Sequence, residues 1–234
     1  MKQNNSHAII VLCSHLCLSE AIQPLEPSEW TACAEKLLSA KKQPCDIFDF
    51  DDSDFADILG LNKEQIERYD RLRDRSASIA IEYTRLESMG IFITTRADPE
   101  YPALLKKKLA KNSPPLFYYC GDIGIANDEC IGFVGSRNID ECDADFTRKL
   151  IKKCLKNRFS IVSGGARGVD STAAEAIMQN NGVAIEYVAD SLSRKIKDKD
   201  VSRRIRDERL LIFSAAVPSA EFSVGMAMQR NKYI

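Results

Sequence analysis

The chain has 234 residues, enough for one large domain or two small ones with a real hydrophobic core. Its apolar content of 44%, charged content of 29% and net charge of −1 are those of an ordinary globular protein and favour no class of partner. No apolar run reaches the roughly 18 residues that a membrane span needs, and residues 8–18 are too short and too interrupted for a signal peptide. We therefore expect a cytoplasmic protein without a membrane segment, whose residues 8–18 form a buried first helix.

Residues 1–90 are predicted to form a small all-helical domain. A long helix is expected over residues 62–89, because Asn62 and Gln65 match a capping box at its start and Gly90 suits its C-terminus. The preceding turn, Leu59-Gly60-Leu61, is typical of a helix–hairpin–helix that binds DNA, and equally of any tight connection between two helices.

Charge is divided unequally along the chain. Residues 1–90 carry 10 basic and 16 acidic side chains, whereas residues 91–234 carry 23 basic and 18 acidic ones. A polyanion would therefore prefer the second part. The pattern changes near residue 90, where we place a domain boundary. Two strands and a short basic helix are expected between residues 91 and 119, although residues 91–124 could also be a connector.

From residue 131 onward, strands and helices alternate regularly. This alternation predicts a Rossmann-like parallel sheet with flanking helices, and the apolar run 131–134 suits a fully buried parallel strand. Four strands and a final half-helix look unfinished, so we expect the domain to continue past Ile234. Strands are predicted at residues 131–134, 159–162, 183–188 and 210–213, and helices at 143–157, 171–181, 192–208 and 222–230.

The carboxyl ends of the first two strands carry small and basic residues. In parallel sheets ligands bind at these ends, where small residues let backbone N–H groups approach an anion and Arg forks suit phosphate. The loop before a helix also gains from the helix dipole. We predict a phosphate-binding site from the two loops together. Its members are Gly135, Ser136, Arg137, Ser163, Gly164, Gly165, Ala166 and Arg167.

The last residues add further candidates. Arg230, Asn231 and Lys232, next to aromatic side chains, could contact phosphates and stack on bases. The helix over residues 194–209 has eight basic and four acidic residues, which we interpret as solvated surface that mildly favours DNA.

Several chemistries have no pattern here. Residues 163–168 do not match the dinucleotide fingerprint, and no G-K-[ST] occurs, which argues against NAD binding and Walker-type ATP hydrolysis. Asp170 is interpreted as a helix N-cap. The eight cysteines include no Cys-x-x-Cys and are accompanied by two histidines, so we expect free, mostly buried thiols, no metal and no cofactor.

Five segments, in this order, resemble the DprA/Smf family of DNA-processing proteins. They are residues 93–102 (ITTRADPEYP), 114–122 (PPLFYYCGD), 134–137 (VGSR), 163–170 (SGGARGVD) and 230–234 (RNKYI). The resemblance implies a SAM-like helical domain before an extended Rossmann-like domain. It also implies binding of single-stranded DNA in a basic pocket, help in loading a RecA-type recombinase during natural transformation (competence), and a homodimer.

By position in the family's motifs, Ser136, Arg137, Gly164, Gly165 and Lys232 would touch the DNA backbone. The chain departs from the family at Ala173-Ala174-Glu175, where Ala-His is common, and at residues 189–192, where a Tyr-Pro loop is usual. It also ends where the family's domain continues, so a dimer surface and a C-terminal winged helix are expected to be absent.

Three functions compete at this stage. The first is a non-enzymatic protein that binds single-stranded DNA in recombination. The second is a nucleotide phosphoribohydrolase, in which Arg137 or Arg167 would work with Glu175, although its usual P-G-G-x-G-T loop is not present. The third is a sensor of a nucleotide signal in a defence or stress system.

Overall fold

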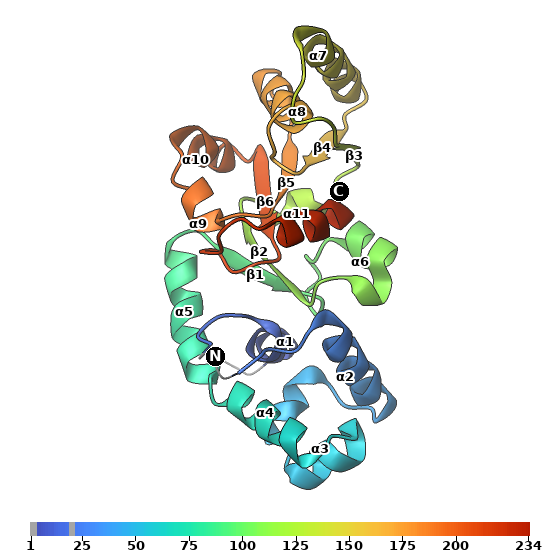
Figure 1. The fold of residues 1–234 in the computed structure, drawn as a ribbon, viewed down its shortest axis with the longest axis vertical. Coiled ribbons are helices and arrows are strands. Elements are labelled where there is room, and N and C mark those ends of the chain that lie inside the picture. Colours follow the sequence, from blue (N-terminus) through green and yellow to red (C-terminus); the bar gives the residue numbers. More distant parts are fainter. Residues whose placement is uncertain (1–3, 19–21) are drawn as a thin grey trace. The chain divides into compact units, whose positions relative to one another are not determined.

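The computed structural model describes residues 4–18 and 22–234 (Figure 1). Contacts divide the chain into two compact units, Met1–Phe117 and Tyr118–Ile234. All helices before residue 90 belong to the first unit, together with a strand and a short basic helix that follow them. The domain boundary near residue 90 stays a prediction.

The first unit is built mainly of short helices around an apolar core. The buried first helix predicted over residues 8–18 is confirmed for Ala8 to Cys13, where α1 is buried, but α1 ends at Cys13 and residues 14–18 are not helical. Among the described residues no helix is long and apolar enough to cross a membrane. The elements are α1 (Asn5–Cys13), α2 (Pro27–Ser39), η1 (Pro44–Asp49), α3 (Asp52–Leu59), α4 (Lys63–Arg73), α5 (Ser76–Ser88), β1 (Phe92–Thr95), α6 (Ala103–Leu109) and η2 (Ala110–Asn112).

The long helix predicted over residues 62–89 is wrong, because it is broken into α4 and α5. The capping box at its start is confirmed: Asn62 accepts from Gln65 N at 2.9 Å and Gln65 accepts from Asn62 N at 3.0 Å. The break lies at Arg75, whose buried guanidinium donates to the carbonyls of Val11 and Leu16 near the end of α1. This tertiary contact overrides the local helical pattern.

The sheet has the strand order β1-β2-β6-β5-β4-β3. The strands β3, β4, β5 and β6 are parallel, which confirms the Rossmann-like sheet, and β2 joins β6 in antiparallel pairing. Every residue of β4, β5 and β6 is buried. The bounds are β2 (Leu116–Cys120), β3 (Cys130–Phe133), β4 (Ser160–Ser163), β5 (Ala184–Val188) and β6 (Leu210–Ser214).

The prediction that β3 is fully buried is wrong. β3 is the last strand of the sheet, with a paired neighbour on one side only. Ile131 is 37% exposed and Val134, just after the strand, is 65% exposed. An apolar run alone does not distinguish a central parallel strand from an edge strand, because the difference depends on neighbours distant in sequence.

The helices of the second unit pack against this sheet (Figure 1). The single helix predicted over residues 192–208 is two helices, because Asp198 starts a new one by accepting from Asp200 N at 2.9 Å and Val201 N at 3.0 Å. The elements are η3 (Ile123–Asn127), α7 (Glu141–Lys156), α8 (Val169–Gln179), α9 (Leu192–Lys195), α10 (Lys199–Arg206), α11 (Val224–Arg230) and η4 (Asn231–Tyr233).

Candidate nucleic-acid interface

The two predicted loops meet at the carboxyl edge of the sheet. They start level with each other, because β3 and β4 pair in parallel with Phe133 opposite Ser163. Val169 N donates to the Ser136 carbonyl at 3.1 Å, which ties the second loop to the first. At Gly168, with φ +83°, an added Cβ would lie 2.1 Å from the same carbonyl oxygen. Only glycine therefore permits this close approach.

Asp170 binds the backbone of the second loop. Its carboxylate is buried and accepts from Gly164 N at 3.0 Å and from Ala166 N at 3.4 Å. Burial raises the pKa of this carboxyl, while the two N–H donors oppose the rise. The interpretation of Asp170 as the N-cap is wrong: Gly168 occupies that position, and Asp170 lies within the first turn of α8.

Three backbone N–H groups of the second loop donate to acceptors within the protein. Besides the two N–H groups that Asp170 accepts, Gly165 N donates to Ser163 Oγ at 3.3 Å. In the first loop, Ser136 Oγ donates to the Asn138 carbonyl at 2.6 Å. These hydrogen bonds fix the shape of the two loops.

The exposed cations of the two loops are Arg137 and Arg167. Arg137 is close enough to Arg230 for its charge to lower the pKa of that guanidinium, after the larger effect of burial. The carboxylates of Asp170 and Glu186 are buried and that of Asp190 is half-buried, whereas these two guanidinium groups face solvent. The accessible charge at this edge is therefore positive, and planar guanidinium groups suit phosphate oxygens.

Arg230 supports the loop from inside the fold. It is 6% exposed, and its Nη1 donates to the Tyr187 carbonyl at 3.2 Å. A Cβ added to Gly164 would lie 1.1 Å from this Nη1, so the guanidinium packs directly on the glycine. Arg230 was predicted as a phosphate contact, but its burial gives it a supporting position. Asn231 and Lys232 are exposed on η4, and among the described residues no salt bridge joins Lys232 to the two loops.

Sequence reasoning missed Glu186 and Lys195. Glu186 is 6% exposed on β5 and pairs with Lys195 Nζ of α9 at 2.5 Å. The same Nζ lies 2.8 Å from where a Cβ on Gly165 would be, so this pair borders the loop. The available signal was a carboxylate inside a strand predicted to be buried, because such a charge needs a partner.

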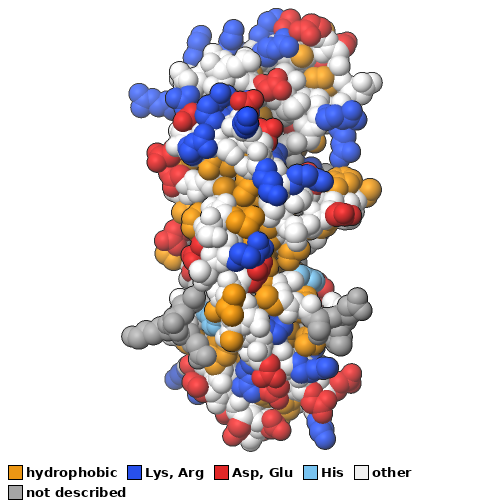
Figure 2. All heavy atoms as spheres, turned by 90° about the vertical axis from the view of Figure 1, so that its left-hand side faces the viewer, with side chains coloured by type: hydrophobic (Ala, Val, Ile, Leu, Met, Phe, Trp, Pro, Cys, Tyr) orange, Lys and Arg blue, Asp and Glu red, His pale blue; other side chains and the backbone are white. Residues whose placement is uncertain are grey.

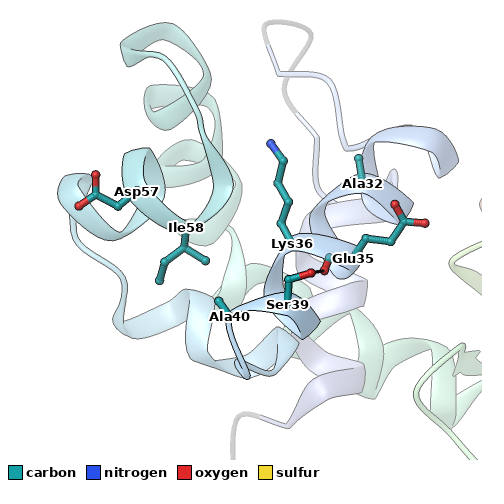
Figure 3. A pocket seen from close by; sticks show the side chains of 7 residues that line it. All are labelled: Ala32, Glu35, Lys36, Ser39, Ala40, Asp57 and Ile58. Atoms are coloured by element: carbon teal, nitrogen blue, oxygen red, sulfur yellow. Dashed lines mark hydrogen bonds between the residues drawn. The ribbon is translucent and has the colours of Figure 1, made fainter.

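An open pocket of about 480 Å³ lies elsewhere, between α2 and α3 of the first unit (Figure 3). Glu35 and Asp57 contribute carboxylates to its lining, and Lys36 contributes the amine. This mixed lining offers no excess positive charge for phosphate. In the described parts of the chain, no group of His, Cys, Asp and Glu side chains could hold a metal ion.

Comparisons with known proteins agree on one family. The model of the family described as DNA recombination-mediator protein A matches residues 92–234. Protein Smf of Synechocystis sp. is 28% identical over 145 residues, which are 59% of this chain and 34% of that protein. The DNA processing protein DprA of Streptococcus pneumoniae is 31% identical over 141 residues, 59% of this chain and 46% of that protein.

The fold agrees with a solved structure. The X-ray structure of DNA processing protein A from Streptococcus pneumoniae covers 100% of this chain with a TM-score of 0.71 and 23% identity, and 75% of that structure is matched. The chain spans less than half the length of both curated relatives.

Proposed function

This chain belongs to the DprA/Smf family, that of the DNA recombination-mediator protein A, and from this premise we propose that its second unit binds the phosphate backbone of single-stranded DNA without chemical reaction. The observation that carries the proposal is the exposure of Arg137 and Arg167 at the carboxyl edge, above carboxylates that are buried and engaged. Phosphate oxygens accept from guanidinium groups with good geometry, whatever the base sequence.

Apolar side chains near the same edge support single strands over duplex. Phe222 is 51% exposed, Val224 is 72% exposed and Met228 is 65% exposed, and the latter two lie on α11. The helix ends at Arg230, which packs under Gly164. Unpaired bases stack on exposed aromatic surface, which duplex DNA does not allow, because its bases are already stacked.

The wider role is also a proposal. Relatives of the chain are DNA-processing proteins, and we propose that this one acts in the cytoplasm in DNA recombination and transformation. In this role it would assist a RecA-type recombinase.

The enzymatic alternative has less support. A phosphoribohydrolase would need Glu175 beside Arg137 or Arg167, and no salt bridge among the described residues joins them. Asp170, the carboxylate nearest to the loop backbone, is engaged with two N–H groups. For the nucleotide sensor, no specific observation favours a mononucleotide over a strand.

Fluorescence anisotropy with labelled oligo-dT tests the proposal. Binding should weaken with salt, with a log–log slope of about −0.7 for each phosphate neutralised. Arg137→Ala should cost about 1–3 kcal/mol of binding free energy, the range for a charge-assisted contact. Duplex DNA and mononucleotides should compete poorly. A mononucleotide that raises the melting temperature, with no binding of oligo-dT, would instead support the sensor or the hydrolase.

A further inference from the structure

Basic side chains lead away from the candidate interface along α9 and α10. Figure 1 places α10 at the side of the sheet unit, and Figure 2 shows Lys and Arg side chains gathered with fewer carboxylates over the upper part of that face. We name as the basic tract the exposed cations Arg194, Lys197, Lys199 and Arg206. Arg204, half-buried on α10, adds to the same charge.

Two of the four carboxylates in residues 194–209 are engaged, and the other two, Asp207 and Glu208, are exposed just after α10. Asp198 accepts from the backbone at the start of α10, and Asp200 pairs with Arg203 at 2.8 Å. In the described parts of the chain, none of the four cations of the basic tract forms a salt bridge. Residues 194–209 carry eight basic and four acidic side chains, so the segment keeps an excess of positive charge.

The basic tract begins at the interface and is held in place by folded contacts. Lys195, next to Arg194, borders Gly165 through its pair with Glu186. The buried Leu192 anchors α9, and Ser191 Oγ donates to the Pro218 carbonyl at 3.0 Å. From there α10 adds eight residues, about 12 Å of helix at 1.5 Å per residue, packed against β6. The cations thus lie on a fixed surface continuous with the loops.

We propose that the basic tract is a second binding surface for single-stranded DNA, which takes the phosphates of the nucleotides that leave the loop site. This inference rests on the proposed function of the loops. The four cations lie on α9, on α10 and in the turn between them, beginning beside Gly165 of the loop site, and none of them is held in a salt bridge among the described residues. Each phosphate contact releases counterions, so a longer strand gains affinity that a short one does not.

The test compares two strand lengths with the full chain. The variant Lys197→Glu/Lys199→Glu reverses two exposed charges, and Glu at the first position of α10 suits the helix dipole. The matched control, Lys152→Glu/Lys153→Glu, makes the same charge change at exposed positions of α7. Circular dichroism checks that both variants fold. Anisotropy is measured with oligo-dT of about 6 and about 20 nucleotides at several salt concentrations.

We expect the tract variant to lose about tenfold in affinity for the long strand, and the magnitude of its salt slope to fall by about 1.4, since two phosphate contacts are lost. Its affinity for the short strand should match that of the α7 control. Equal losses in both variants would overturn the inference, because net charge alone would then explain them. Equal affinity of the unmodified protein for both strand lengths would also overturn it, while leaving the loop site intact. If the unmodified protein binds neither strand, the proposed function fails, and the inference with it.

Discussion

Two glycine turns of this protein match sequence patterns of DNA-binding elements, and the structure shows that they differ in their surroundings. In the helical unit, Gly60 ends α3 with φ +61°, and Lys36 donates to the Leu59 carbonyl beside it. In the sheet unit, Gly165 has φ +62° and lies between Gly164 and Ala166, whose N–H groups are held by one buried carboxylate. The two glycines have nearly the same φ angle.

Their surroundings differ in charge. The turn at Gly60 follows an acidic segment, residues 46–57, which carries six Asp. The amine of Lys36 beside it donates to the Leu59 carbonyl. The loop at Gly165 is flanked by exposed Arg137 and Arg167. Left-handed glycine geometry therefore does not by itself define an anion site. Under the proposed function, we expect the net charge that solvent can reach to decide which turn attracts phosphate.

The largest expected effect is at Asp170. Asp170→Ala would leave the N–H groups of Gly164 and Ala166 buried without an acceptor, at about 1–3 kcal/mol each, so we expect the free energy of unfolding to fall by about 3 kcal/mol. Urea denaturation measures this fall. Asp170→Asn keeps one acceptor oxygen and should lose less. An alanine variant as stable as the unmodified protein would show that the carboxylate of Asp170 does not stabilise the loop at Gly165.

Gly164→Ala should have the next largest effect. The added Cβ would occupy the place of Arg230 Nη1, so the guanidinium must move and its bond to the Tyr187 carbonyl breaks. We expect a loss of about 2 kcal/mol in stability, within the range for overpacking, and weaker binding of oligo-dT. Gly225→Ala is the control, because its nearest neighbour is 4.0 Å away, and it should be neutral or stabilising. Equal behaviour of the two variants would contradict the packing of Arg230 on Gly164.

Lys36→Met tests the turn at Gly60 in the helical unit. It removes the donor to the Leu59 carbonyl, and we expect a loss of about 1 kcal/mol in stability with unchanged affinity for single-stranded DNA. Denaturation and anisotropy are measured on the same preparation. Reduced DNA affinity with normal stability would show that the helical turn contacts the strand after all.

The smallest effect concerns pH. Burial raises the pKa of Asp170 above its ordinary value of 3.8 in the folded protein. Between that value and the raised one, the folded state binds a proton that the unfolded state has released, so the contribution of Asp170 to stability falls as pH rises through this window. The difference in unfolding free energy between the unmodified protein and Asp170→Asn should follow this fall. A difference that rises with pH there would contradict the assigned direction.

Local patterns predicted the alternation of strands and helices well, because hydrophobic periodicity is a local property. They failed where a distant residue decides the outcome. Arg75 breaks a continuous helical pattern by bonding to α1, and β3 lies at a sheet edge that its own apolar sequence does not reveal. The two loops, by contrast, could be predicted from their own glycines and arginines, because these are local in sequence.

The support beneath the loops could not be predicted in this way. The pair of Glu186 with Lys195 depends on two elements meeting, and so does the packing of Arg230 under Gly164. The roles of Asn231 and Lys232 stay predictions.

The position of Arg230 also has a consequence for how the protein comes to be active. The second loop ends at residue 168, whereas Arg230, which supports it, belongs to a helix more than fifty residues later. During synthesis, the strands β3 and β4 can pair long before this helix emerges. Contacts of such large sequence separation form slowly, since the intervening chain must first be ordered. The support of the loop by Arg230 should therefore form late, after the paired strands that carry the loop.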